Sequence, residues 1–265
     1  CEKLQRHMRF LLNKGGLYKV YNNNLLYHGC VPLTENGELK SVRVYGHSYK
    51  GKGLYEAMES YVRKGFYALD PREKERGRDL MWYIWLGEGS PLFGKDKMAT
   101  FERYFLAEKE THKEKKNPYY SMLENEEVID KILAEFGLPA EGTHIINGHV
   151  PVKSKNGENP IKCGGKVLVI DGGFSKAYQK ETGIAGYTLI YNSYGLILAA
   201  HEPFESTEAA IEKESDIHSD SIIVKRVVQR KLVGDTDIGR ELKEQIADLE
   251  MLLEAYRSGR ITERI

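Results

Sequence analysis

What the sequence has little of excludes several classes of protein. Its 265 residues include three cysteines, Cys1, Cys30 and Cys163, with long spacings and no CxxC pair. An odd number of widely spaced cysteines is typical of a reduced, cytoplasmic protein and argues against a disulfide framework. No run approaches the roughly 20 apolar residues that span a bilayer. The apolar fraction of 41% is nevertheless enough for a folded core. We therefore expect a cytoplasmic protein with no membrane partner.

An excess of one charge is also missing. Lys and Arg together number 39, and so do Asp and Glu, so the formal net charge is zero. A nucleic-acid-binding domain is usually basic, so we expect no nucleic-acid partner. A balanced total still allows a local basic pocket for an anionic metabolite. The chain also begins with Cys1 rather than Met and lacks the apolar core of a signal peptide. We expect a piece of a longer protein.

The order of predicted elements indicates an α/β fold with mixed sheets. Helices are predicted over residues 2–13, 54–64, 125–136, 207–215 and 239–257. Strands are predicted over residues 17–21, 25–27, 145–146, 166–170, 186–191, 196–200 and 221–233. Residues 46–53 read as a polar loop, and residues 79–85 fit either a strand or a helix. We expect residues 1–205 to form one domain and residues 206–265 a charged strand–helix tail, which packs on the domain or makes a subunit contact.

Two histidines lie shortly after predicted strands. His28 precedes Gly29, His149 follows Gly148, and a proline comes shortly after each histidine. Glycine permits tight turns and proline ends strands. In α/β folds the loops at the carboxyl ends of strands carry the chemistry. A rigid backbone that aims an imidazole suits a metal ligand, although a single strand-end histidine is more often a surface or hydrogen-bonded residue.

Three lysines and one aspartate lie in loops near these histidines or near other strand ends. Lys95 and Lys97 belong to the glycine-rich run LGEGSPLFGKDK, and Lys153 follows His149 closely. Ammonium groups are compact charges that suit phosphate binding, although a solvated charged turn explains the loop equally well. Asp171 ends the predicted strand KVLVI and precedes two glycines. It is a candidate to orient a histidine or a plain turn former.

Longer runs around these residues resemble a known family. LLYHGCVP and NGHVP resemble the late histidine motifs of the calcineurin-like metallophosphatases. NGHVPVK, NPIKCGGKVLVIDGGFSKAY, GYTLIYNSYG, WLGEGSPLFGKDKMATFERYF and EKETHKEKKNPYY are similar to the carboxyl-terminal half of the class III fructose-1,6-bisphosphatases of Firmicutes-type bacteria. The resemblance implies part of a β-sandwich flanked by helices. It also implies a gluconeogenic enzyme that hydrolyses the 1-phosphate of fructose 1,6-bisphosphate to fructose 6-phosphate and phosphate.

The resemblance assigns roles to the candidate residues. It makes His28 and His149 ligands of a dinuclear manganese centre and Asp171 a supporting residue. The three lysines would bind the phosphates of the sugar bisphosphate. The early motifs of the superfamily, roughly GDxHG, GDxxDRG and GNH[DE], are absent from this sequence. We therefore assign no catalytic residue here, and expect the remaining ligands in an amino-terminal half and an incomplete, inactive fragment when this chain is alone.

Two alternatives stay open. The first is another metallophosphoesterase, acting for example on a phosphoprotein. The second is a non-catalytic oligomerisation or regulatory half. Independently of these alternatives, we expect the protein to be a homo-oligomer. Convergence of the two histidines tests the metal hypothesis, because imidazoles that share a centre ligate at roughly 2.0–2.1 Å and cannot lie more than about 10 Å apart.

Overall fold

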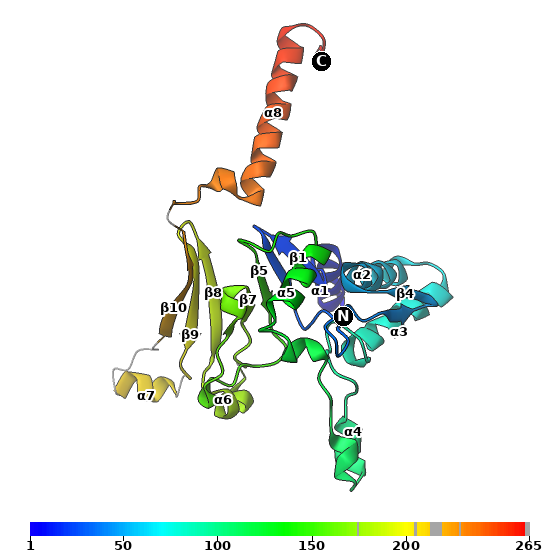
Figure 1. Cartoon of the computed structure of the whole chain (residues 1–265). Helices are drawn as coiled ribbons and strands as arrows, with labels where there is room; N and C mark the ends of the chain where they lie inside the picture. Colours follow the sequence, from blue (N-terminus) through cyan, green and yellow to red (C-terminus); the bar gives the residue numbers. More distant parts are fainter. Residues whose placement is uncertain (174, 204–205, 213–218, 228, 263–265) are drawn as a thin grey trace. The chain divides into compact units, whose positions relative to one another are not determined.

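The computed structural model describes residues 1–173, 175–203, 206–212, 219–227 and 229–262 (Figure 1). It divides into two compact units. The first contains Cys1–Thr188 and Ala199–Asp220, and the second contains Leu189–Leu198 and Ser221–Ile265. The predicted division at residue 205 concerns the domains of an intact protein and stays a prediction. None of the helices in the described ranges is long and apolar enough to cross a membrane.

A five-stranded sheet forms the centre of the first unit. Its order is β1 (Tyr18–Tyr21), β2 (Asn24–Tyr27), β5 (His144–Asn147), β7 (Val167–Val169) and β6 (Ile161–Lys162). β1 and β6 are antiparallel to their neighbours, whereas β2, β5 and β7 run parallel. The predicted mixed α/β class is therefore confirmed. Because β2 and β5 are parallel neighbours, their carboxyl ends lie at the same edge of the sheet.

The central strands are buried. Leu25, Ile145 and Val167 are fully inaccessible to solvent, as expected for parallel strands covered on both faces. Helix α5 (Glu126–Glu135) belongs to the same unit and buries Val128, Ile129, Ile132 and Leu133. The Asn125 side chain caps this helix by accepting a hydrogen bond from the Val128 amide at 3.3 Å. The sequence predicted both the helix and its end near residue 136.

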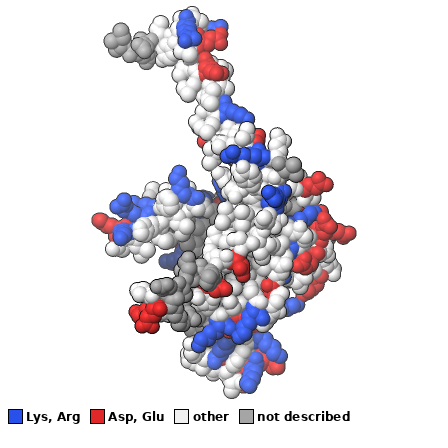
Figure 2. Space-filling model, turned by 90° about the vertical axis from the view of Figure 1, so that its left-hand side faces the viewer, with Lys and Arg blue, Asp and Glu red and all other residues white. Residues whose placement is uncertain are grey.

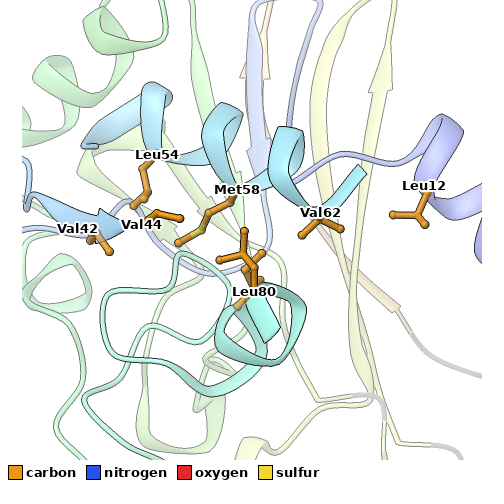
Figure 3. Close-up of a cluster of buried hydrophobic side chains, with 8 residues drawn as sticks. Leu12, Val42, Val44, Leu54, Met58, Val62 and Leu80 are labelled. Carbon is orange, nitrogen blue, oxygen red and sulfur yellow. The ribbon is translucent and has the colours of Figure 1, made fainter. Parts of the chain in front are cut away.

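A second apolar cluster joins three helices and a hairpin in the same unit. The helices are α1 (Glu2–Lys14), α2 (Gly51–Tyr67) and α3 (Pro71–Leu86), and the hairpin pairs β3 (Val42–Val44) with β4 (His47–Tyr49). The buried side chains of this cluster are Leu12, Val42, Val44, Leu54, Met58, Val62, Leu80 and Ile84 (Figure 3). A Cβ atom added at Gly65 would overlap the Gly77 backbone. Glycine at these positions lets the backbones of α2 and α3 touch.

The structure corrects the expectation for residues 46–53 and decides between the two alternatives for residues 79–85. The predicted polar loop 46–53 is wrong, because His47 lies on β4 and α2 begins at Gly51. Tyr45 and Gly46 both have positive φ angles, 48° and 88°, and so form the tight turn of a hairpin. Residues 79–85 are helical and complete α3. This helix begins with Pro71 after Asp70, whose carboxylate accepts from the Arg72 amide at 2.9 Å.

The other elements of the first unit are short. They are α4 (Thr100–Phe105), η1 (Lys109–His112), η2 (Pro118–Ser121), η3 (Ser154–Asn156), η4 (Cys163–Gly165), α6 (Lys176–Thr182) and α7 (Thr207–Glu212). The predicted helix 207–215 is present to residue 212, and its remainder lies outside the described residues.

A three-stranded sheet contributes residues to both units. Its order is β10 (Ser219–Arg226), β9 (Gly195–His201) and β8 (Gly186–Asn192). The predicted strand 221–233 ends at residue 226, and residue 228 lies outside the described ranges. The second unit continues with η5 (Val233–Asp235) and the long helix α8 (Asp237–Arg257). Thr236 caps α8, since its hydroxyl accepts from the Gly239 amide at 3.1 Å.

Candidate metal centre

Two loops at one edge of the five-stranded sheet carry the candidate histidines. Leu26 pairs with Ile146 in the parallel β2–β5 ladder, so His28 and His149 leave the sheet on the same side. The Gly148 amide donates to the His28 carbonyl at 2.9 Å. The Asn147 side-chain amide donates to the Gly29 carbonyl at 3.0 Å. These two hydrogen bonds join the loops and fix the backbone beneath both imidazoles.

The two imidazole rings converge. His28 Nε2 and His149 Nδ1 lie 3.0 Å apart. The ring centroids are 4.9 Å apart and the planes are inclined by 68°. The sequence left open whether these residues, separated by 121 positions, meet at all. Parallel pairing of β2 with β5 brings them together, as the metal hypothesis requires.

The spacing of the ring nitrogens fits a shared ion. Two nitrogens at roughly 2.1 Å from one ion lie about 2.9–3.4 Å apart when the angle between them is about 90–109°. The observed separation of 3.0 Å is within this range. A direct hydrogen bond between one protonated and one unprotonated ring nitrogen has the same length. Geometry alone therefore permits both arrangements, and only metal binding separates them.

The surroundings of His149 favour a neutral ring. Burial lowers the pKa of His149, and the neighbouring His28 ring and Lys95 ammonium lower it further, whereas the Phe93 backbone and Asp171 act in the opposite direction. A neutral imidazole is the form that binds metal ions. Its Nε2 is buried without a well-formed hydrogen bond to any described residue. Both features are compatible with a metal ligand at this position.

Backbone geometry around the histidines places strain at one residue and close packing at another. His149 has φ +67°, a left-handed conformation that is uncommon for histidine and is often found at functional sites. The sequence had suggested that Gly148 takes the special turn, but a Cβ atom there would meet only ordinary contacts, the nearest at 3.4 Å. At Gly29, a Cβ atom would overlap the Pro91 carbonyl oxygen. Gly29 therefore makes room for another loop's backbone.

The three candidate lysines are not equivalent. Lys95 lines the same cavity as both histidines, and its ammonium group pairs with Glu114 at 2.8 Å. Lys97 Nζ instead donates to the Thr111 carbonyl at 2.8 Å. The side chain of Lys153 is exposed, and its amide donates to Glu158 at 3.0 Å. The structure therefore places Lys95 beside the imidazoles, while the phosphate-binding roles of Lys97 and Lys153 stay predictions.

Asp171 acts on the His149 loop through the backbone. Its carbonyl accepts from the Val152 amide at 2.8 Å, and its carboxylate accepts from the Gly173 amide at 3.0 Å. No hydrogen bond between described residues joins Asp171 to either imidazole. The carboxylate thus forms the turn after β7, and the turn supports the loop that carries His149. A direct orienting contact with a histidine stays a prediction.

A cavity of about 610 Å³ opens beside the histidines. Most of its lining is apolar and comes from α1, α2, α3 and residues 92–98. Its polar side chains are His28, His149, Lys95, Glu59 and Arg63. Arg63 Nη2 lies 3.3 Å from Glu59 Oε2 and donates to the Gly15 carbonyl at 2.6 Å. A concave apolar pocket with a few polar groups is typical of a binding site. The sequence did not indicate the Glu59–Arg63 pair.

The described residues at this edge include two candidate metal-ligating side chains, His28 and His149. Within the described ranges, no group of three or more His, Cys, Asp or Glu side chains is arranged to hold an ion. Cys30 is close in sequence to His28, but burial raises the pKa of its thiol to about 12.

Comparison with known proteins identifies relatives along nearly the whole chain. The family described as Firmicute fructose-1,6-bisphosphatase matches residues 1–258. The fructose-1,6-bisphosphatase class 3 of Clostridium novyi is 58% identical over 264 residues, which are 99% of this chain and 40% of that protein. The proteins of the same name from Clostridium acetobutylicum and Clostridium botulinum are 57% and 59% identical over 263 residues. The chain thus spans about 40% of the length of these relatives. No solved structure matches it.

Proposed function

Because the chain belongs to the Firmicute fructose-1,6-bisphosphatase family, we propose that it is part of a cytoplasmic, gluconeogenic fructose-1,6-bisphosphatase. The intact protein hydrolyses the 1-phosphate of fructose 1,6-bisphosphate and releases fructose 6-phosphate and phosphate. The observation that carries this proposal is the 3.0 Å separation of the His28 and His149 ring nitrogens beside a cavity. A non-catalytic half of the protein has no need of this arrangement.

His28 and His149 are proposed to hold one manganese ion of a dinuclear, calcineurin-like centre. Imidazole nitrogens combined with carboxylate oxygens suit manganese, iron and zinc. A bound ion of this kind acts as a Lewis acid on a phosphoryl oxygen. The chain's own contribution is positional. The Gly148–His28 and Asn147–Gly29 hydrogen bonds hold the two rings at a fixed separation, and the apolar cavity wall limits access of water.

Lys95 is proposed to attract the phosphorylated sugar to this edge. Its ammonium group lines the cavity with both imidazoles, and Glu114 holds it at 2.8 Å. Glu114 also accepts from the Ala99 amide at 3.0 Å, so the lysine is anchored through a carboxylate that is itself fixed. A compact ammonium charge suits a phosphate group. The role is one of substrate binding, with no proton transfer assigned to Lys95.

The remaining ligands are proposed to come from the part of the intact protein outside this chain. Two observations support this. The relatives are about two and a half times as long as the matched region, which is 40% of their length. The described residues also contain no cluster of three or more metal-ligating side chains. The chain alone would then bind manganese weakly and turn over little substrate.

The test uses the intact protein that contains this chain. Manganese-dependent phosphate release from fructose 1,6-bisphosphate is measured for the wild type and for His28→Ala and His149→Ala. Each variant should lose at least about 100-fold in activity, because supporting contacts at metal sites alone are worth 10–100-fold. His47→Ala, on exposed β4, is the matched control and should retain full activity. Full activity in either site variant would overturn the proposal.

A further inference from the structure

Helix α8 presents a regular apolar stripe to solvent. Leu242, Ile246, Leu249, Leu253 and Tyr256 follow one another at intervals of four, three, four and three residues. Their exposed fractions are 45%, 55%, 64%, 48% and 43%. Figure 2 shows charged side chains of both signs on this helix with uncharged surface between them. Five large apolar side chains exposed along one line of a helix form a surface that is typical of a protein–protein contact.

The spacing of the stripe is that of a coiled coil. Intervals of four and three average 3.5 residues, as in a heptad seam, and the exposed Ile238 and Leu252 add apolar surface along one flank of it. In heptad notation Ile246 and Leu253 are a positions, and Leu242, Leu249 and Tyr256 are d positions. The second unit does not fill this seam. η5 packs at the start of α8, where a Cβ atom at Gly239 would overlap the Val233 carbonyl oxygen.

We propose that the seam is covered by α8 of a second copy of this chain, in antiparallel orientation. In the favoured register, Leu242 packs against the partner's Leu253, and Ile246 packs against the partner's Leu249. The two-fold axis repeats both contacts and gives four apolar layers. An isologous contact of this kind closes the assembly at a dimer. This inference does not rest on the proposed phosphatase activity.

The charges that flank the seam select this register. In an antiparallel pair, e positions face e positions, and here they are Lys243, Glu250 and Arg257. The proposed register places Lys243 beside the partner's Glu250, and the symmetry makes this pair twice. Sliding by one heptad would place Glu250 beside the partner's Glu250, and Lys243 beside the partner's Arg257. Like charges at these positions disfavour the alternative.

A parallel pair gains nothing comparable. Its e positions face g positions of the partner, which are Ile238, Gln245 and Leu252. No opposite charges would then meet across the seam. Lys243 also donates to the Gly234 carbonyl at 2.9 Å, which uses one of the three hydrogens of its ammonium group. Two hydrogens are left for the partner's carboxylate, and η5 holds the lysine in place.

The test exchanges the charges of Lys243 and Glu250 and measures the mass of the resulting assembly. The 265-residue chain and its variants are studied by sedimentation velocity over a range of concentrations. The wild type should dimerise. Glu250→Lys and Lys243→Glu each turn two attractive pairs into two repulsive ones, so each should weaken the dimer about tenfold or more. The double variant restores opposite charges and should recover most of the wild-type affinity.

A matched control is available on the opposite face of the helix. Glu244 is an exposed f position, so Glu244→Lys makes the same charge change away from the seam and should leave dimerisation unchanged. Circular dichroism checks that every variant keeps its helix content. A monomeric wild type would overturn the proposal. So would a dimer that resists both single exchanges or is not restored by the double exchange, because another segment or face would then cover the seam or make the contact.

Discussion

The sheet edge that carries His28 and His149 and the helix α8 are both open surfaces, but they are open for different reasons. The edge lies on largely buried strands, and its loops are tied by a backbone hydrogen bond of 2.9 Å and by a hydrogen bond of 3.0 Å from the Asn147 side chain to the Gly29 carbonyl. α8 instead exposes its apolar seam along its length. The edge therefore has fixed geometry and, on our proposal, needs ligands from outside this chain, whereas the helix needs a packing partner. Substitutions in the two regions should separate these two kinds of incompleteness.

The largest expected difference is between a buried strand residue and a seam residue. Ile145 is fully buried in β5, so Ile145→Ala should lower the free energy of unfolding of the chain by about 3–4 kcal/mol. Leu249 is 64% exposed, so Leu249→Ala should cost the protomer less than about 1 kcal/mol while weakening self-association. Urea unfolding at low protein concentration measures both. A similar loss in the two variants would mean that α8 packs within its own chain.

Two glycines beside the histidines should respond differently to the same change. Gly29→Ala should cost about 2–3 kcal/mol, because the added methyl overlaps the Pro91 carbonyl and forces the two loops apart. Gly148→Ala is the matched control and should cost less than about 1 kcal/mol, since its nearest contact is 3.4 Å. Urea unfolding compares the two variants. Equal losses would contradict the packing described for Gly29.

The hydrogen bond between the two loops should have a moderate effect. Asn147 is 2% exposed and donates to the Gly29 carbonyl. Asn147→Ala leaves that carbonyl without this donor and should cost about 1–2 kcal/mol. Asn156→Ala, at an exposed site on η3, is the control and should be neutral. If Asn147→Ala were equally neutral, the side chain would not tie the loops.

The smallest expected effect concerns the anchor of Lys95. Burial alone would raise the pKa of Glu114, but hydrogen bonds from Lys95 and the Ala99 amide and the nearby Arg103 hold it below its ordinary value of 4.5. Glu114 therefore stabilises the fold above that pH and loses its contribution as the pH falls through the lowered pKa. Glu114→Gln should lower the free energy of unfolding by about 0.5 kcal/mol at pH 7. It should also make the fall of this free energy at acidic pH less steep, as measured by urea unfolding at several pH values. If the pH dependence of stability were unchanged in Glu114→Gln, the Lys95–Glu114 pair would contribute nothing to stability.

Much of this arrangement could be predicted because its determinants are local. His28 and His149 were found from apolar runs that end in glycine and proline, and the α8 seam from apolar periodicity. The α/β class followed from the same patterns. His149's left-handed backbone was not predictable, since the neighbouring Gly148 was the residue expected to adopt it. The Glu59–Arg63 pair escaped notice because only tertiary packing places it in the cavity. The hydrogen bond from the Lys97 ammonium group to the Thr111 carbonyl was not predictable either, because the two residues are distant in the sequence.

The most direct test of the central claim is whether His28 and His149 share one ion. Manganese is titrated into the ¹⁵N-labelled chain, and paramagnetic broadening of the backbone amide signals of Gly29 and Gly148 is followed by NMR. The account predicts that both signals broaden together at about millimolar manganese, as expected for two ligands. Either His28→Ala or His149→Ala should abolish the broadening of both signals, whereas His47→Ala should change neither. Persistent broadening of one signal in a single variant would contradict a shared ion.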